Sequence, residues 1–122
     1  MTKKILIADD EQNIVISLEF LMKREGFEVL VANDGEEAAR RIRSEHPDLV
    51  LLDVMMPKKS GFEVCQEIKA DPAMAAVRIL MLTAKGRDTE VAKGLALGAD
   101  AYMTKPFSTK ELVEKVRSLL GG

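Results

Sequence analysis

The sequence predicts an α/β fold in which a doubly wound, five-stranded parallel sheet, (βα)5, carries helices on both faces. Short apolar runs rich in Ile, Val and Leu alternate five times with longer segments of helical periodicity, which is typical of strands joined by crossover helices. The 122 residues fit one domain. We therefore expect a single unit over 1–122, with residues 121–122 (Gly121 and Gly122) as a free tail or the stub of a linker.

The strands are expected at the apolar runs. Their predicted ranges are Lys4–Ala8, Phe27–Ala32, Leu49–Asp53, Arg78–Thr83 and Ala101–Thr104. The first, third and fourth runs are apolar on both faces, as expected for interior parallel strands covered by helices. A spatial strand order of 2-1-3-4-5 places these three runs side by side.

Helices are expected between the strands, because apolar residues recur there at helical spacing. One face of the first and of the last helix is apolar and reads as core, formed by Ile14, Leu18, Leu21 and Met22 and by Leu112, Val116 and Leu119. Ser108 with Glu111 predicts a capping box, and Asp34 with Glu37 a looser one. Gly26 stands where the first helix should end. Five helices are expected in all.

Composition excludes several classes of protein. The net charge of -2 gives no electrostatic case for nucleic acid, and the longest apolar runs are far short of the roughly 20 residues that span a bilayer. No apolar signal segment precedes the first strand. The single cysteine, Cys65, cannot form an intramolecular disulfide, so the sequence predicts a cytoplasmic protein that binds neither DNA nor membrane.

Polar residues close four of the five apolar runs. The first run ends in Asp9-Asp10-Glu11, the third in Asp53, the fourth in Thr83 and the fifth in Thr104-Lys105. Ligands of open α/β sheets bind beyond the carboxyl ends of the strands, so these residues are expected around one pocket. The sequence thus predicts carboxylates, a hydroxyl and an ammonium at one edge of the sheet.

Such a cluster of carboxylates calls for a cation. Two carboxylates about 5 Å apart repel by roughly 3 kcal/mol at an effective dielectric constant of about 20. A bound metal ion removes that penalty. All-oxygen ligands favour Mg²⁺ or Mn²⁺, and a site with two or three carboxylates that leaves positions to water and phosphate suits Mg²⁺.

Five motifs, taken together, resemble the receiver domains of two-component response regulators, the chemotaxis-Y-like phosphoacceptor family with a flavodoxin-like fold. Any one motif is weak evidence, but five in the family's order are specific, and they cover essentially the whole chain. The motifs are Lys4–Glu11, Asp48–Pro57, Gly61–Glu63, Leu82–Ala84 and Gly98–Phe107. The resemblance implies a phosphorylation-dependent signalling switch rather than an enzyme in the usual sense.

The resemblance also implies a role for each polar residue. Asp53 is the implied phosphoacceptor, and Mg²⁺ is implied between Asp9, Asp10, Asp53 and the backbone carbonyl of Met55. Lys105 neutralises charge during the transfer and Thr83 hydrogen-bonds a phosphoryl oxygen. Tyr102 is the implied switch aromatic, which turns inward as Thr83 moves. A cis bond between Lys105 and Pro106 is also implied.

Partners follow from the same resemblance. The phosphodonor is a histidine kinase or phosphotransfer protein, or a small donor such as acetyl phosphate. The output face is the fourth helix, fifth strand and fifth helix, where Lys93, Tyr102 and residues 110–115 meet a protein target. Receivers attached to winged-helix DNA-binding domains usually carry an aspartate, used in dimer pairing, where this chain has Ala101. A monomer or weak dimer is therefore expected.

Two positions that flank the path of attacking water in receivers carry bulky residues here. They are Met55, two residues after the acceptor, and Lys85, two residues after Thr83. Bulk at these positions predicts slow hydrolysis of the aspartyl phosphate by the protein itself.

Each residue also has a plainer interpretation. Acids after a strand often cap a helix, Thr83 could cap the next segment, and Lys105 could lie at the surface. Tyr102 could pack against a helix with its hydroxyl in water. Cys65 is interpreted as a packing residue and His46 as an exposed helix end. It is the joint placement of the acids and Lys105 that favours a site.

Other functions are open. A Mg²⁺-dependent phosphohydrolase of the haloacid dehalogenase type uses an aspartate nucleophile after a strand, but in a D-x-D pair after the first strand that Asp9 and Glu11 only imitate. A flavin carrier needs a phosphate-cradling loop where the acids stand, and no P-loop motif occurs. An interaction module that is never phosphorylated is the hardest alternative to dismiss.

Overall fold

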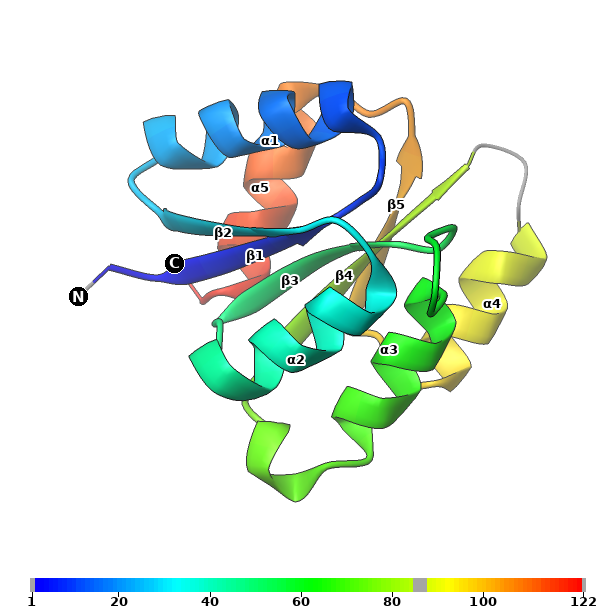
Figure 1. Ribbon diagram of the computed structural model, residues 1–122. Helices are drawn as coiled ribbons and strands as arrows, with labels where there is room; N and C mark the ends of the chain where they lie inside the picture. Colours follow the sequence, from blue (N-terminus) through cyan, green and yellow to red (C-terminus); the bar gives the residue numbers. More distant parts are fainter. Residues whose placement is uncertain (1, 85–87, 122) are drawn as a thin grey trace.

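The protein contains a single five-stranded parallel sheet with the strand order β2-β1-β3-β4-β5 (Figure 1). The computed structural model describes residues 2–84 and 88–121. The strands are β1 (Lys4–Ala8), β2 (Glu28–Ala32), β3 (Leu49–Asp53), β4 (Arg78–Ala84) and β5 (Ala101–Lys105). The predicted fold class and strand order are confirmed.

Helices cover both faces of the sheet (Figure 1). Their bounds are α1 (Gln12–Arg24), α2 (Gly35–Glu45), α3 (Gly61–Lys69), α4 (Asp88–Ala96) and α5 (Thr109–Leu119), with a short 3-10 helix, η1, at Pro72–Met74. Residues of α1 and α5 form one core cluster with the sheet, and residues of α2 and α3 form the other. The prediction of five α-helices is confirmed for the described part of the chain.

Alternation along the interior strands divides the core between the two faces. Leu6, Val50 and Leu52 belong to the cluster under α2 and α3, whereas Ile7 and Leu51 belong to the cluster under α1 and α5. All five side chains are fully buried. Burial of an aliphatic side chain of this size stabilises a fold by about 1.5 to 3 kcal/mol, so the interior strands fix the backbone that carries the site.

Side chains cap the helices where the sequence predicts. Ser108 accepts a hydrogen bond from the Glu111 backbone N–H at 3.0 Å, and Asp34 accepts one from that of Glu37 at 2.8 Å. Gly26, with φ of +93°, follows the end of α1. Each cap satisfies a backbone group that the helix itself leaves unpaired.

Strand ends differ from the prediction by one residue at three places. β2 begins at Glu28 because the Phe27 backbone N–H donates to the Met22 carbonyl in α1 instead. β4 and β5 each extend one residue further because Ala84 pairs with Lys105.

His46 is exposed at the end of α2 and Cys65 is fully buried, as predicted. Lys85 and Gly122 lie outside the described residues.

The amino end of the sheet holds two carboxylates in hydrogen bonds. Asp48 accepts the Lys4 backbone N–H at 2.7 Å. Asp100 accepts the Ile79 backbone N–H and the Lys69 ammonium, both at 2.8 Å. These contacts join β1 to the start of β3, and the end of α3 to the starts of β4 and β5.

Among the helices of residues 2–84 and 88–121, none has the length and apolar character needed to cross a membrane.

Candidate functional site

Asp53 ends β3 and lies almost buried, with 6% of its surface exposed. The Val54 backbone N–H donates to the Leu82 carbonyl at 3.2 Å, which extends the pairing of β3 with β4 past the acid. Gly61, the first residue of α3, packs so closely on the Asp53 carbonyl that a Cβ at position 61 would overlap it. The backbone of Asp53 is therefore held from both sides.

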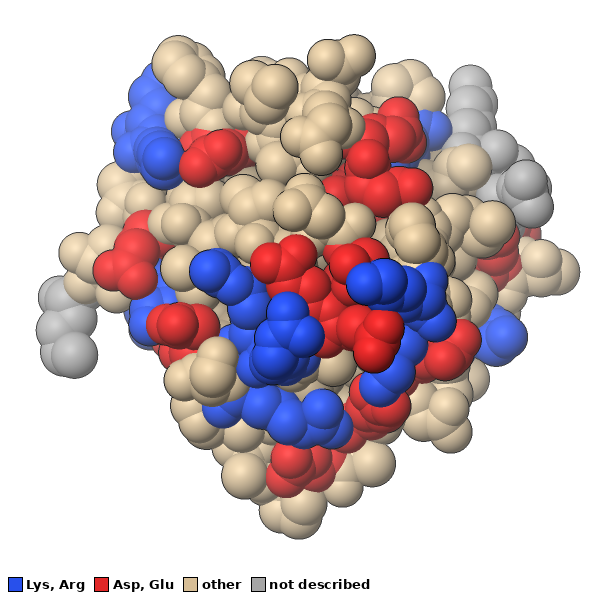
Figure 2. All heavy atoms as spheres, viewed as in Figure 1, with Lys and Arg blue, Asp and Glu red and all other residues tan. Residues whose placement is uncertain are grey.

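Asp9 follows β1 and is fully buried. Its Oδ1 accepts the Glu11 backbone N–H at 2.9 Å, and its Oδ2 accepts a hydrogen bond from Lys105 Nζ at 3.0 Å. Asp10 is exposed beside it. In Figure 2, acidic side chains gather at the upper right, near the turn from β1 into α1. Asp9 is therefore held in a fixed position by burial, whereas Asp10 is open to water.

Lys105, the last residue of β5, is the cation at this edge. Its Nζ lies 3.0 Å from Asp9, 3.3 Å from Asp53 and 3.5 Å from Glu11. Burial lowers the pKa of Lys105, but the hydrogen bond to Asp9 and the charge of Asp53 outweigh it, so the pKa is raised overall. Lys105 therefore stays protonated and holds the two buried acids together. The sequence did not predict the contact with Glu11, although the Asp-Asp-Glu run was its available signal.

Burial raises the pKa of Asp53 to about 6, and the nearby negative charge of Asp9 adds to the rise. The positive charge of Lys105 acts in the opposite direction without cancelling it. The site thus carries more negative charge than its lysine neutralises. A cation added between the acids would favour the ionised form of Asp53.

The acids are arranged as a metal site requires. Asp9, Asp10 and Asp53 each offer a carboxylate oxygen, and these oxygens lie within 4.8 Å of one another. Oxygen donors of this kind suit a hard divalent cation. Asp10, Asp53 and Met55 also line a cavity of about 300 Å³ with room for water or a phosphoryl group. The residues present fit a divalent ion by their chemistry and their crowding.

Thr83 is a second indication that the site suits a ligand oxygen. It lies near the end of β4, next to Leu82, which pairs with Asp53. Its side chain is buried, and its hydroxyl has no hydrogen-bond partner among the described residues. An unsatisfied buried hydroxyl costs about 1 to 3 kcal/mol, so a ligand oxygen within its reach would be stabilised.

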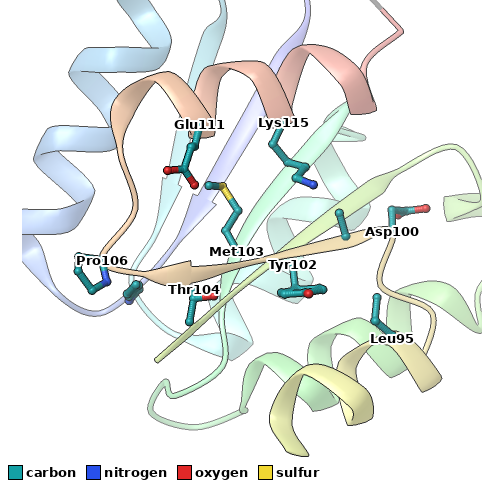
Figure 3. A pocket seen from close by; sticks show the side chains of 10 residues that line it. Leu95, Asp100, Tyr102, Met103, Thr104, Pro106, Glu111 and Lys115 are labelled. Atoms are coloured by element: carbon teal, nitrogen blue, oxygen red, sulfur yellow. The ribbon is translucent and has the colours of Figure 1, made fainter. Parts of the chain in front are cut away.

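Tyr102 lies apart from the acids, on the side of β5 that faces α4. Its side chain is 42% exposed. It lines a cavity of about 660 Å³ together with Leu95 of α4 and Lys115 of α5 (Figure 3). Lys93 of α4 does not extend into this cavity, because its ammonium lies 4.6 Å from the Phe62 ring.

The structure brings together Asp9, Asp10, Asp53 and Lys105, as the sequence predicts, with Thr83 and Met55 at the same edge. The peptide bond between Lys105 and Pro106 is cis, which confirms that prediction. The fold and the residues at this edge of the sheet define a class of protein: a flavodoxin-like α/β domain with acids and a lysine at the carboxyl ends of β1, β3 and β5.

The chain belongs to the response regulator receiver domain family, whose model matches residues 5–117. It is 48% identical over 120 residues to the alkaline phosphatase synthesis transcriptional regulatory protein PhoP of Bacillus subtilis, covering 98% of this chain. The chain spans about half (49%) of that relative's length. It is a receiver domain of two-component response regulators, a signalling protein.

Solved structures agree. A candidate response regulator from Chloroflexus aurantiacus is 34% identical, with a TM-score of 0.95 and full coverage of both chains. The chemotaxis response regulator CheY4 of Vibrio cholerae is 29% identical, with a TM-score of 0.92, covering 98% of this chain and 100% of that one. Both likenesses span the whole sheet and all the helices.

Proposed function

We propose that Asp53 accepts a phosphoryl group from a phosphohistidine of a histidine kinase or phosphotransfer protein, or from acetyl phosphate. The observation that carries the proposal is the position of its carboxylate, buried at the end of β3 and 3.3 Å from Lys105 Nζ, with two further acids close by. A carboxylate oxygen of Asp53 forms the new bond to phosphorus. The bond from phosphorus to the histidine nitrogen breaks, and its electron pair returns to the imidazole.

The surrounding residues supply position and charge. Lys105 already contacts Asp53, so its ammonium is placed to stabilise negative charge on the transferred group. Asp9, Asp10, Asp53 and the Met55 carbonyl are the proposed ligands of Mg²⁺ or Mn²⁺. When bound, the ion supplies charge neutralisation of the phosphoryl oxygens. Transfer therefore needs only alignment and electrostatics from the protein.

Thr83 and Tyr102 are the proposed switch. The Thr83 hydroxyl has no hydrogen-bond partner within residues 2–84 and 88–121, and it gains one when it donates to a phosphoryl oxygen. Tyr102 turns inward as Thr83 moves. Moving a two-state equilibrium from 1:99 to 99:1 takes about 5.5 kcal/mol. Charge-assisted bonds from Thr83 and Lys105, at roughly 1.5 to 3 kcal/mol each, reach that range together.

The proposed output surface is formed by α4, β5 and α5, where the cavity around Tyr102 lies. The relative from Bacillus subtilis is named a transcriptional regulatory protein. We propose that the signal received by this chain also controls transcription. A net charge of -2 disfavours direct binding of DNA by this chain, so another domain or partner would contact the DNA. The proposed form is a monomer or weak dimer. Membership of the response regulator receiver family supports the proposed cytoplasmic location.

The decisive experiment is incubation with acetyl phosphate and Mg²⁺, followed by intact-mass measurement. Wild-type protein is expected to gain one phosphoryl group, and Asp53→Asn none. Beryllofluoride with Mg²⁺ should shift the NMR resonances of Asp53, Thr83 and Tyr102. A wild-type protein that stays unmodified, with an unchanged spectrum, would instead be an interaction module. Sustained turnover of a generic phosphate ester would indicate a phosphohydrolase.

A further inference from the structure

The loop after Asp53 contains a strained turn. Lys58 adopts a φ of +71°, which is uncommon for a residue with a side chain, and the Lys59 backbone N–H donates to the Pro57 carbonyl at 2.8 Å. A hydrogen bond that spans two residues around a positive φ is the γ-turn of the rare, strained kind. Such a turn persists only when surrounding contacts hold it.

Those contacts come from the first residues of α2, which lies beside this loop in Figure 1. The Gly35 backbone N–H donates to the same Pro57 carbonyl at 3.2 Å. The Asp34 carboxylate lies 3.7 Å from Lys58 Nζ. The Gly35 Cα packs on the Lys59 carbonyl, which a Cβ at position 35 would overlap. Two adjacent residues of one helix end thus contact all three residues of the turn.

The loop is fixed at its other end by α3. The Gly61 backbone N–H donates to the Val54 carbonyl at 2.8 Å, and Gly61 packs on the Asp53 carbonyl. Residues 55 and 56 lie between that anchor and the γ-turn. Their backbone conformation therefore depends on contacts from two helices, of which α2 contributes no side chain to the acidic cluster itself.

We infer that Asp34 and Gly35 are positioning residues for the divalent ion, acting through residues 57–59 on the backbone of Met55. The inference deepens the proposed function and rests on it. A backbone carbonyl serves a hard cation only where it is already directed at the site, because reordering a relaxed loop on binding lowers affinity. Close packing at position 35, which excludes any side chain, is what keeps the turn from relaxing.

The test is the affinity for Mg²⁺ alone, measured by NMR titration of the loop amides. Gly35→Ala is expected to weaken Mg²⁺ binding by about tenfold and to shift the amide resonances of residues 55–59 before any metal is added. Gly94→Ala is the matched control, since a Cβ at position 94 would meet nothing nearer than Met81 at 3.5 Å. Thermal unfolding without metal reports whether each variant is folded.

A second pair of variants separates positioning from helix capping. Asp34→Asn keeps the cap, because asparagine caps as well as aspartate, but loses the charge opposite Lys58. It is expected to weaken Mg²⁺ binding about twofold to threefold. Asp71→Asn is its control: Asp71 also caps a helix, through the Ala73 backbone N–H, and pairs with Arg43 at 3.8 Å, away from the loop.

The outcomes distinguish the two proposals. Wild-type protein that does not bind Mg²⁺ would overturn both the proposed function and this inference. Wild-type binding with equal affinity in folded Gly35→Ala would overturn the inference alone. If Gly35→Ala does not fold, the comparison of Asp34→Asn with Asp71→Asn decides the inference. Equal affinities for Mg²⁺ in the two variants would reject the inference. Weaker binding by Asp34→Asn than by Asp71→Asn would support it.

Discussion

The two ends of the sheet differ in how many cations pair with their carboxylates. At the amino end, Asp100 has a backbone N–H and the Lys69 ammonium at 2.8 Å and the Arg78 guanidinium at 3.7 Å, so one acid faces two cations. At the carboxyl end, Asp9, Glu11 and Asp53 share Lys105. The negative charge of Asp100 is neutralised at the amino end, whereas negative charge is left in excess at the carboxyl end.

The difference separates stability from function. The contacts of Asp100 at the amino end hold α3, β4 and β5 together without any ligand. The carboxyl end has a raised pKa at Asp53 and, at Thr83, a hydroxyl with no hydrogen-bond partner among the described residues. The proposed cation and phosphoryl group would relieve both. Substitutions at the two ends should therefore affect different measurements.

The largest effect is expected from removing the cation of the carboxyl end. Lys105→Met should lower the rate of phosphorylation by acetyl phosphate by about two to three orders of magnitude, the cost of losing a charge-stabilising donor. Mg²⁺ binding should persist, because no proposed ligand is lost. Time-resolved intact mass and NMR titration measure the two quantities. An unchanged rate would show that Lys105 serves the fold alone.

At the amino end, Asp100→Ala should lower the free energy of unfolding by about 2 to 3 kcal/mol, because it leaves the Ile79 N–H without its acceptor and the Lys69 ammonium without its carboxylate, with only the Val77 carbonyl still accepting from that ammonium. Mg²⁺ affinity should not change. Glu25→Gln is the control: its pair with Arg117 is half-exposed, and loss of such a pair costs less than about 1 kcal/mol. Urea unfolding measures both. Weakened Mg²⁺ binding in Asp100→Ala would contradict the separation.

Excess charge at the carboxyl end should make Asp53 destabilising in metal-free protein. A folded pKa of about 6 lies above the ordinary 3.8, so the folded state holds its proton more tightly and loses stability as pH rises from about 4 to 6. Asp53→Asn should therefore be more stable by about 2 to 3 kcal/mol at pH 8, and nearly equal to wild type near pH 4. Urea unfolding in EDTA at both pH values measures this, and a wild-type curve that does not fall through this window would contradict the raised pKa.

The smallest effect is expected at Met55, whose side chain is 70% exposed at the same end. We expect Met55→Asn to hydrolyse its aspartyl phosphate about fivefold faster, a change of about 1 kcal/mol, because a polar side chain admits and orients water. Loss of the phosphoryl mass over time measures the rate. Hydrolysis no faster than wild type would reject the prediction that bulk at position 55 slows hydrolysis.

The sequence predicted the carboxyl end better than the amino end. Strands and site acids follow from apolar runs and from the residues that close them, so Asp9, Asp53 and Lys105 could be placed together in advance. The network around Asp100 joins elements far apart in the chain, and neither periodicity nor capping patterns encode it. The γ-turn at Lys58 could not be predicted for the same reason, because the contacts that hold it come from the start of α2, which is distant in the chain.

Tyr102 is the single tyrosine of a chain that has no tryptophan. Fluorescence excited at wavelengths that phenylalanine does not absorb therefore arises from one ring, and that ring lies half in solvent in the cavity between α4 and α5. An emission spectrum reads that cavity directly, without a label. A partner that settles there, or a rotation of the ring, would register as a change in brightness.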